Sequence, residues 1–270
     1  MNRAQLAQKM YAKHPELAKK IAPKKGLHKC KIGQKSSIEL DLGDWFERKA
    51  LWSECERGII DSLKLDLKKG DVFFDIGAHV GIISVSIAEH IGDRGTVYAF
   101  EPDMRAYTRL YENMLLNPNL RIIPVGYPLA EAPKDIHMYE SSVLGWSTTV
   151  KDATGFGISR EAKFTARPIT ATSIDKLIYG IPHPFKPPQA IKIDTEGSEF
   201  DILRGAQKLL KDNPPKLIIA EQNNWINGFC GRTAKHFLDM DEYMKEFGYY
   251  VNNFSLLDDC GVNVIYYRKD

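Results

Sequence analysis

Residues 73–82 read FFDIGAHVGI and contain the clearest structural signal in the chain. The continuous apolar run that leads into Asp75 is typical of a strand buried on both faces of a parallel sheet. Gly77 and Gly81 then allow a tight turn into a helix, because glycine adopts backbone conformations that other residues avoid. In open α/β sheets, ligands bind at the carboxyl ends of the strands. The stretch therefore predicts a ligand-binding turn at such an end.

Strands and helices are predicted to alternate on either side of this turn. Helices are expected at residues 80–91, 104–117, 199–210 and 234–247, and strands at residues 96–100, 121–125, 190–193 and 217–220. An earlier helix is expected from Ser53, the N-cap of a capping box with Glu56. The last strands, 249–253 and 262–267, follow each other without a helix and predict an antiparallel hairpin at one edge. The predicted fold class is α/β, with a mostly parallel, doubly wound sheet.

The spacing of the two glycines indicates which cofactor the turn binds. A dinucleotide fingerprint needs the pattern GxGxxG, whereas three residues separate Gly77 from Gly81. A carboxylate at Asp75 would repel a pyrophosphate but suits the ammonium group of a methionine moiety. Glu101, at the end of the next strand, is placed to accept hydrogen bonds from a ribose diol. We therefore favour S-adenosylmethionine over NAD.

Further acidic residues follow two later strands. Asp194 and Glu196 lie in the segment IKIDTEGSEF, and Glu221 follows the strand at residues 217–220. The segment has a second interpretation, because carboxylates such as Glu196 and Glu199 also favour the N-terminus of a helix. We assign that role to Glu199 and expect Asp194 and Glu196 to be functional.

Four motifs occur in the order found in one enzyme family. They are DIGAHVG at residues 75–81, YAFEP at 98–102, IKIDTEGSEFDILRGA at 191–206 and LIIAEQ at 217–222. With these motifs the chain resembles the FkbM-type family of S-adenosylmethionine-dependent methyltransferases, over about residues 56–221. The resemblance implies a Rossmann-like class I methyltransferase fold. It also implies methyl transfer to a hydroxyl oxygen, often on sugars or polyketide-derived natural products.

The resemblance also assigns site residues. The cofactor-binding set is Glu56, Asp75, Gly77, Ala78, His79, Gly81, Glu101 and Pro102, and the acceptor-side acids are Asp194 and Glu196. His79 stands where many members have asparagine, and residues 124–129 contain glycine and proline where asparagine and alanine are usual. The adenine contacts are therefore not carried over from the family.

A hydroxyl acceptor is a poor nucleophile near neutral pH, so a base or a divalent cation is expected beside it. The candidates for the base are Asp194, Glu196, Glu221 and His79, in that order. The first three alternatively bind Mg²⁺ through their carboxylate oxygens.

The acceptor is expected to be a small molecule or a glycan. Two strands, at residues 135–139 and 162–168, surround a weakly periodic polar segment that contains Trp146. Trp146, Asn223, Asn224 and Trp225 offer ring faces and amides suited to a sugar. These residues are the predicted lining of the acceptor pocket.

The charge of the chain is unevenly distributed. Residues 1–35 carry a net charge of +9, which leaves −7 for the remainder of a chain whose net charge is +2. We therefore predict a basic N-terminal extension at residues 1–35, with one or two short helices interrupted by Pro15, and a methyltransferase domain at residues 36–270. An anionic partner of the extension, either a nucleic acid or a membrane surface, is one interpretation, and a solvated arm is another.

Composition excludes some classes of protein. No apolar run is long enough to span a bilayer, and the first thirty residues contain no apolar stretch typical of a signal peptide, so a cytoplasmic location is expected. The four cysteines form no CxxC pair, which favours reduced, structural thiols. Two alternatives to a small-molecule O-methyltransferase stay open: an RNA 2′-O-methyltransferase that uses the basic extension, and a non-catalytic scaffold.

Overall fold

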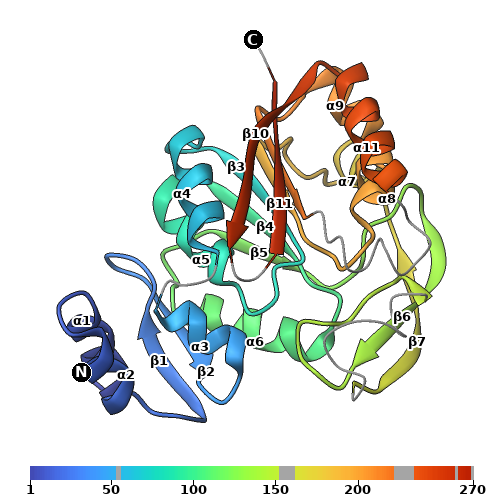
Figure 1. Ribbon diagram of the computed structural model, residues 1–270. Coiled ribbons are helices and arrows are strands. Elements are labelled where there is room, and N and C mark those ends of the chain that lie inside the picture. The colour runs from blue at the N-terminus through green and yellow to red at the C-terminus, as the bar shows by residue number, and fades with distance from the viewer. Residues whose placement is uncertain (53–55, 152–161, 222–233, 259–260, 269–270) are drawn as a thin grey trace.

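The computed structural model describes residues 1–52, 56–151, 162–221, 234–258 and 261–268 (Figure 1). Its centre is a seven-stranded sheet in the order β10–β11–β9–β8–β3–β4–β5. The strands are β3 (Val72–Ile76), β4 (Thr96–Phe100), β5 (Ile122–Val125), β8 (Ala190–Ile193), β9 (Leu217–Glu221), β10 (Tyr249–Asp258) and β11 (Gly261–Arg268). β11 is antiparallel to both of its neighbours, and the pairs from β9 to β5 are parallel. The sheet confirms the predicted Rossmann-like α/β class and the antiparallel edge hairpin.

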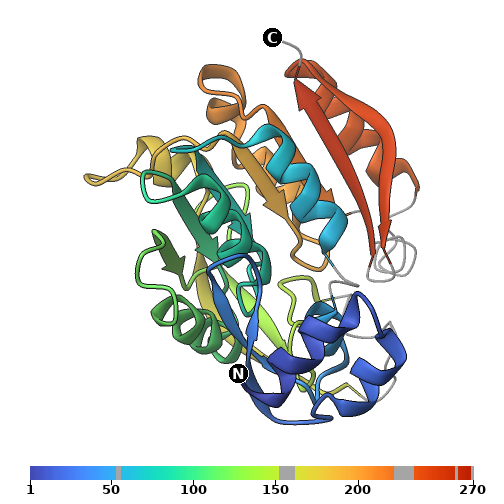
Figure 2. The ribbon, with the colours of Figure 1, turned by 90° about the vertical axis from the view of Figure 1, so that its left-hand side faces the viewer.

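Helices cover both faces of the sheet (Figure 2). One face carries α4 (Arg57–Asp66), α5 (Ile82–Ile91) and α6 (Met104–Leu115), and the other carries α7 (Ile174–Tyr179), α8 (Glu199–Arg204), α9 (Gln207–Asp212) and α11 (Ala234–Glu246). Side chains alternate between the two faces along a strand. Phe73 accordingly packs in the core beneath α4 and α5, and Phe74 packs in the core beneath α7 to α11.

The strand order reverses between β3 and β8. From β3 the chain proceeds outward to β4 and β5, and it later returns to place β8 and β9 on the other side of β3. Such a reversal opens a crevice at the carboxyl ends of the two strands, where open α/β sheets bind their ligands. The fold therefore places a crevice directly after Ile76 and Ile193.

Two predicted helix boundaries are wrong. The helix predicted at residues 199–210 is split into α8 and α9 at Gly205, where a Cβ would lie 2.2 Å from the carbonyl oxygen of Ala130. The predicted capping box also fails, because α4 begins at Arg57, and Glu56 is its N-cap, with a left-handed φ of 58° and no side-chain cap bond. Ser53 lies outside the described residues. The sequence patterns also missed α7, which Ser173 caps through a hydrogen bond from the backbone N–H of Lys176.

The N-terminal region is folded onto the crevice end of the sheet (Figures 1 and 2). It consists of α1 (Arg3–Tyr11), α2 (Pro15–Ile21), the antiparallel strands β1 (Leu27–Lys31) and β2 (Ser37–Asp41), and α3 (Trp45–Leu51). Its core contains Ala4, Ala18 and Cys30 and continues into Val80 and Ile82 beside α5. The predicted division between residues 35 and 36 falls in the turn of the β1–β2 hairpin. The division stays a prediction, and backbone pairing joins its two sides.

Polar contacts fix this region to α6. The side-chain amide of Asn113 bonds the backbone N–H and carbonyl of Glu39. The amide of Asn117 bonds the same two groups of Ser37, as a neighbouring strand would. The buried carboxylate of Glu47 forms an ion pair with Arg109, whose guanidinium also donates to the carbonyl of Glu39. These contacts hold the start of α3 beside the crevice.

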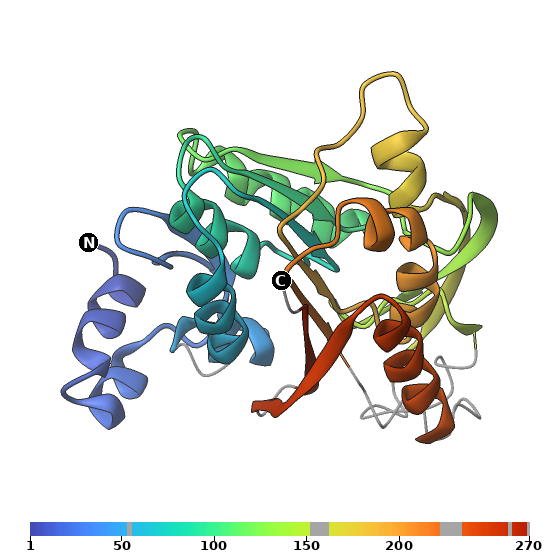
Figure 3. The ribbon, with the colours of Figure 1, turned by 90° about the horizontal axis from the view of Figure 1, so that it is seen from above.

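A second antiparallel pair, β6 (Lys134–Ser141) and β7 (Phe164–Ala171), lies outside the main sheet, opposite the N-terminal region (Figures 1 and 3). The two strands were predicted, and each is longer than its pattern indicated. Among the described helices, none is long and apolar enough to span a membrane.

Candidate active site

A pocket lies in the crevice at the carboxyl ends of the parallel strands. Its lining includes Gly77 and His79 after β3, Glu101, Pro102 and Asp103 after β4, Asp194 and Glu196 after β8, Glu221 at the end of β9, Asp44, Trp45 and Phe46 at the start of α3, and Gly145–Thr149 between β6 and β7. Segments that are distant in the sequence therefore converge on one site.

The turn after β3 is shaped by close backbone packing. Gly77 has a φ of 77°, and a Cβ at this position would lie 1.7 Å from the carbonyl oxygen of Asp194. The backbone N–H groups of Gly77 and Ala78 both donate to the carbonyl of Phe100 at the end of β4. The turn is thus clamped between β4 and β8, and only glycine fits at its first position.

Asp75 lies beneath the turn rather than in the pocket. Its side chain is completely buried; Oδ2 accepts a hydrogen bond from Ser84 Oγ at 2.5 Å, and Oδ1 lies 3.7 Å from Lys192 Nζ. The ammonium of Lys192 donates to the carbonyl oxygen of Gly77 at 2.7 Å and lies 3.4 Å from Asp194 Oδ2. Asp75 is therefore placed to hold Lys192, and the structure gives it no direct access to a ligand.

Glu101 is held in the pocket by two backbone donors. Its Oε2 accepts from the N–H of His79 at 2.8 Å, and its Oε1 accepts from the N–H of Asp103 at 2.9 Å. Burial raises the pKa of Glu101 to about 7, although both hydrogen bonds act in the opposite direction. Each carboxylate oxygen keeps a second lone pair, which is available to a ligand hydroxyl.

His79 is neutral near pH 7. Burial lowers its pKa to about 4, and the nearby charges of Arg109 and Lys192 act in the same direction. The ring packs edge-on against Phe46, and its Nε2 atom has no hydrogen-bond partner among the described residues. A neutral imidazole with a free nitrogen is suited to hydrogen-bonding a polar ligand group.

Three carboxylates gather on the opposite side of the pocket. Oxygen atoms of Asp194, Glu196 and Glu221 all lie within 4.8 Å of one another. Burial, and after it the charge of Asp194, raises the pKa of Glu196 to about 8. The same two causes raise the pKa of Glu221, which also shares a hydrogen bond with Asp194. Both shifts favour the protonated form of these two carboxyls, and the ammonium of Lys192 lies 3.4 Å from Oδ2 of Asp194.

The sequence matches the methyltransferase FkbM domain over residues 75–251. The chain belongs to this family. Membership confirms the predicted family and, for the matched domain, the predicted enzyme class. The matched residues begin within β3 and end within β10, so they include the turn after β3 and the strands β4, β5, β8 and β9.

A curated relative of this FkbM-type chain is the hexuronic acid methyltransferase AglP of Haloferax volcanii. The two are 28% identical over 156 residues, which are 58% of this chain and 58% of the relative. The match thus spans less than two thirds of the relative's length.

Two solved structures are similar in fold. A putative rRNA methylase from Clostridium thermocellum has a TM-score of 0.49 and 13% identity, covering 79% of this chain and 95% of its own. Fibrillarin from Aeropyrum pernix, solved with bound S-adenosyl-L-methionine, has a TM-score of 0.45 and 16% identity, covering 78% of this chain and 74% of its own.

The structure separates the predicted site residues into three groups. The first group lines the pocket: Glu56, Gly77, His79, Glu101, Pro102, Trp146, Asp194, Glu196 and Glu221. The second group, Asp75, Ala78 and Gly81, supports the turn without lining the pocket. The residues of the third group lie outside the described part of the chain: Asn223, Asn224 and Trp225.

Sequence patterns missed several lining residues of the FkbM-type site. Asp44 is the N-cap of α3, and Trp45 and Phe46 at the start of this helix also line the pocket. Asp103 was missed as well, whereas the polar segment that contains residues 147–149 was expected to contribute to the acceptor pocket and does line the pocket. The N-cap signature of Asp44 was available in the sequence, whereas nothing local marks the other residues as neighbours of the site.

Among the described residues, the charged side chains that line the pocket are acidic. Seven described lining residues are acidic: Asp44, Glu56, Glu101, Asp103, Asp194, Glu196 and Glu221. No lysine or arginine is among the described residues that line the pocket. The lysines of the N-terminal region, such as Lys13 and Lys24, are exposed to solvent instead. The pocket is therefore suited to a ligand that carries positive charge.

Proposed function

We propose that this protein transfers the methyl group of S-adenosylmethionine to a hydroxyl oxygen of a sugar or glycan. The observation that carries this proposal is the geometry of the pocket, where Glu101 faces the Asp194–Glu196–Glu221 cluster across one crevice. FkbM membership supports the methyl donor, and the relative that methylates a hexuronic acid supports a sugar acceptor.

The cofactor is expected to lie across the turn after β3. Glu101 accepts hydrogen bonds from the two ribose hydroxyls, and His79 is placed to bond the carboxylate of the methionine moiety. The acidic lining attracts the sulfonium charge. Because methyl transfer removes that charge, the demethylated product binds this lining less tightly, which favours its release.

Methyl transfer from a sulfonium is an in-line displacement, in which the acceptor oxygen attacks the methyl carbon and the sulfur leaves as a thioether. The protein must align the two atoms and accept one proton. Asp194 is the first candidate for the base, because Lys192 at 3.4 Å stabilises its carboxylate form. Burial raises the pKa of Glu196 and of Glu221, which favours their protonated forms and suits them to hydrogen-bonding neighbouring acceptor hydroxyls.

The same cluster provides a second candidate for activating the hydroxyl. Carboxylate oxygens are the ligands that Mg²⁺ prefers, and three of them converge here. Lys192 lies 3.4 Å from Asp194 and offsets part of the charge of that carboxylate. If Mg²⁺ is bound, Asp194, Glu196 and Glu221 hold it, and it acidifies the acceptor hydroxyl.

The first experiment measures cofactor binding and transfer separately. We expect titration calorimetry to detect binding of S-adenosylmethionine, and labelled cofactor to methylate a p-nitrophenyl glucoside or glucuronide, with the product identified by mass spectrometry. Adding EDTA tests the metal, and total RNA as acceptor tests the alternative RNA 2′-O-methyltransferase. Absence of binding at millimolar cofactor would contradict both enzyme assignments and favour the scaffold.

The affinity for S-adenosylmethionine is expected to depend on the ionisation of Glu101. Because its pKa is raised to about 7, the carboxyl is mostly protonated at pH 6 and mostly ionised at pH 8, where it accepts both ribose hydrogen bonds. Affinity should therefore rise about tenfold from pH 6 to pH 8. Glu101→Gln should weaken binding by about ten- to a hundredfold and remove this part of the pH dependence.

The matched control for this measurement is Glu112→Gln, which changes an exposed carboxylate of α6. The cofactor's own amino group also titrates, so the relevant quantity is the difference between the profiles of the wild type and the Glu101→Gln variant. Identical profiles for these two proteins would remove Glu101 from the ribose site.

A further inference from the structure

The stretch from Ser141 to Thr149, here called the strap, bridges the two sides of the pocket. It follows β6, and its last residues contact both the segment after β4 and the segment after β8. Gly145 packs against the ring of His79, so the strap also contacts the turn after β3. The proposed function uses none of these contacts.

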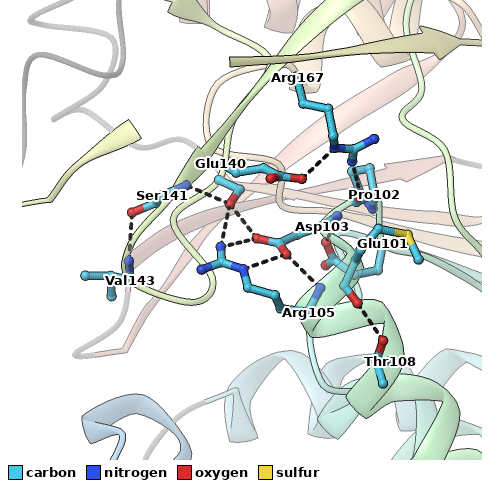
Figure 4. A network of polar contacts seen from close by, with 11 residues as sticks. Glu101, Pro102, Asp103, Arg105, Thr108, Glu140, Ser141, Val143 and Arg167 are labelled. Atoms are coloured by element: carbon cyan, nitrogen blue, oxygen red, sulfur yellow. Dashed lines mark hydrogen bonds and ion pairs between the residues drawn. The ribbon is translucent and has the colours of Figure 1, made fainter. Parts of the chain in front are cut away.

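One side of the strap is bonded to the segment that carries Glu101 (Figure 4). Ser147 Oγ donates to Asp103 Oδ2 at 2.6 Å, and Arg105 Nη2 donates to the same oxygen at 2.5 Å. Burial opposes the charge of Asp103, but these hydrogen bonds lower its pKa, so it is ionised at neutral pH. The backbone N–H of Asp103 in turn donates to Glu101. Ser147 therefore acts on the predicted ribose acid through Asp103.

The other side of the strap is bonded to the acidic cluster. Thr148 Oγ1 donates to the carbonyl oxygen of Glu196 at 2.9 Å, and the hydroxyls of Thr149 and Ser198 lie 2.6 Å apart. Glu196 has a φ of 56°, in the left-handed region that costs a non-glycine residue about 1 kcal/mol or more. A hydrogen bond to its carbonyl opposes relaxation of this backbone, which aims the Glu196 side chain into the pocket.

Hydrogen bonds at its base and along its length hold the strap in place. Tyr139 and Thr148 exchange backbone hydrogen bonds of 2.8 and 3.1 Å, and Ser147 Oγ accepts from the backbone N–H of Ser141. At the base of the strap, Arg167 bonds both Glu140 and the carbonyl of Pro102. These bonds anchor the strap independently of its contacts with Asp103 and Glu196, so the loss of one hydroxyl is expected to affect the side of the pocket that this hydroxyl bonds.

We propose that Ser147 and Thr148 are positioning residues that act on opposite sides of one pocket. Ser147 orients Glu101 through Asp103 for cofactor binding, and Thr148 orients Glu196 for methyl transfer. This inference rests on the proposed function, because it takes Glu101 to bind the ribose and Glu196 to lie beside the acceptor.

Two variants are expected to change different constants, one the Kd for S-adenosylmethionine and the other kcat. Ser147→Ala removes a hydrogen bond to a buried carboxylate, so we expect the Kd for S-adenosylmethionine to rise about tenfold, with kcat at saturating cofactor nearly unchanged. Thr148→Val keeps the shape of the side chain but loses the hydroxyl, so we expect kcat to fall about tenfold, with Kd nearly unchanged. Thr148→Ser keeps the hydroxyl and should therefore retain the kcat of the wild type. Kd is measured by calorimetry, and kcat with the methylated p-nitrophenyl glycoside.

Thr170→Val is the matched control, because it removes a threonine hydroxyl that bonds an exposed carboxylate, Asp135, on the β6–β7 hairpin. Both constants should be unchanged in that variant. Equal loss in Thr148→Ser and Thr148→Val, or the same loss of both constants in Ser147→Ala and Thr148→Val, would overturn the proposal and leave the strap a purely structural element. Failure of the wild type to bind S-adenosylmethionine is a separate result, which overturns the proposed function.

Discussion

Replacing Asp194 with asparagine is expected to lower the rate of methyl transfer by about a hundredfold or more while the affinity for S-adenosylmethionine stays nearly constant. The substitution keeps the size of the side chain and removes its capacity to accept a proton. Lys192 lies 3.4 Å from Asp194, so Asp194 is the member of the cluster that forms an ion pair with a lysine. Single-turnover rates with labelled cofactor measure the chemical step directly.

The matched control is Asp212→Asn, which changes an exposed carboxylate at the end of α9. It should leave both rate and affinity unchanged. If Asp194→Asn transfers methyl groups at the wild-type rate, Asp194 is neither the base nor a required metal ligand, and Glu196 becomes the first candidate. A rate that falls in Asp194→Asn, and that EDTA also abolishes in the wild type, assigns the loss to the metal.

The turn after β3 could be predicted because its signal is local. An apolar strand, an acid and two glycines occur within residues 73–82, and each reflects a constraint that acts on the neighbouring backbone. The position of Glu101 follows from the same logic, since it comes directly after the adjacent parallel strand, β4. Periodicity and strand ends were thus sufficient to find the crevice and four of the acids that line it, Glu101, Asp194, Glu196 and Glu221.

The role of Asp75 could not be predicted in this way. Its position at a strand end suggested contact with the cofactor, but side chains alternate between the faces of a strand, and that of Asp75 is directed beneath the turn toward Ser84. The register places Asp75 opposite Lys192 on β8, a strand that belongs to a much later part of the chain. Only the pairing of the two strands reveals that these residues form an ion pair.

The strap illustrates the same limit over a longer distance. Ser147 and Asp103 are 44 residues apart in the sequence, and Thr148 and Glu196 are 48 apart. Short polar residues in an irregular segment carry no periodic signal, so their partners depend entirely on how the β6–β7 hairpin packs. Sequence reasoning placed Trp146 in the acceptor pocket by its chemistry and passed over the two hydroxyls beside it.

The ion pair between Asp75 and Lys192 leads to the second large expected effect. Lys192→Met should reduce the free energy of unfolding by about 3 to 5 kcal/mol at neutral pH, because it leaves a buried carboxylate without its cation. Both side chains are almost completely inaccessible to solvent, at 0% and 2% exposure. Adding Asp75→Asn should recover much of the loss, because no uncompensated charge is then buried. Equilibrium denaturation of both variants measures the difference.

The pH dependence of stability distinguishes a lost ion pair from a simple packing defect. Burial already raises the pKa of Asp75 with Lys192 beside it, and removing the cation raises this pKa further. The folded form of Lys192→Met then binds a proton that the unfolded chain releases, so its stability should fall as the pH rises above the unfolded pKa of the carboxyl, about 4. The Asp75→Asn/Lys192→Met variant lacks this carboxyl and should show no slope from it, whereas the slope of the single variant should exceed that of the wild type. Equal slopes in the single and double variants would mean that the Asp75 carboxyl titrates in the folded single variant as it does in the unfolded chain, which would contradict a lost charge partner as the cause of the destabilisation.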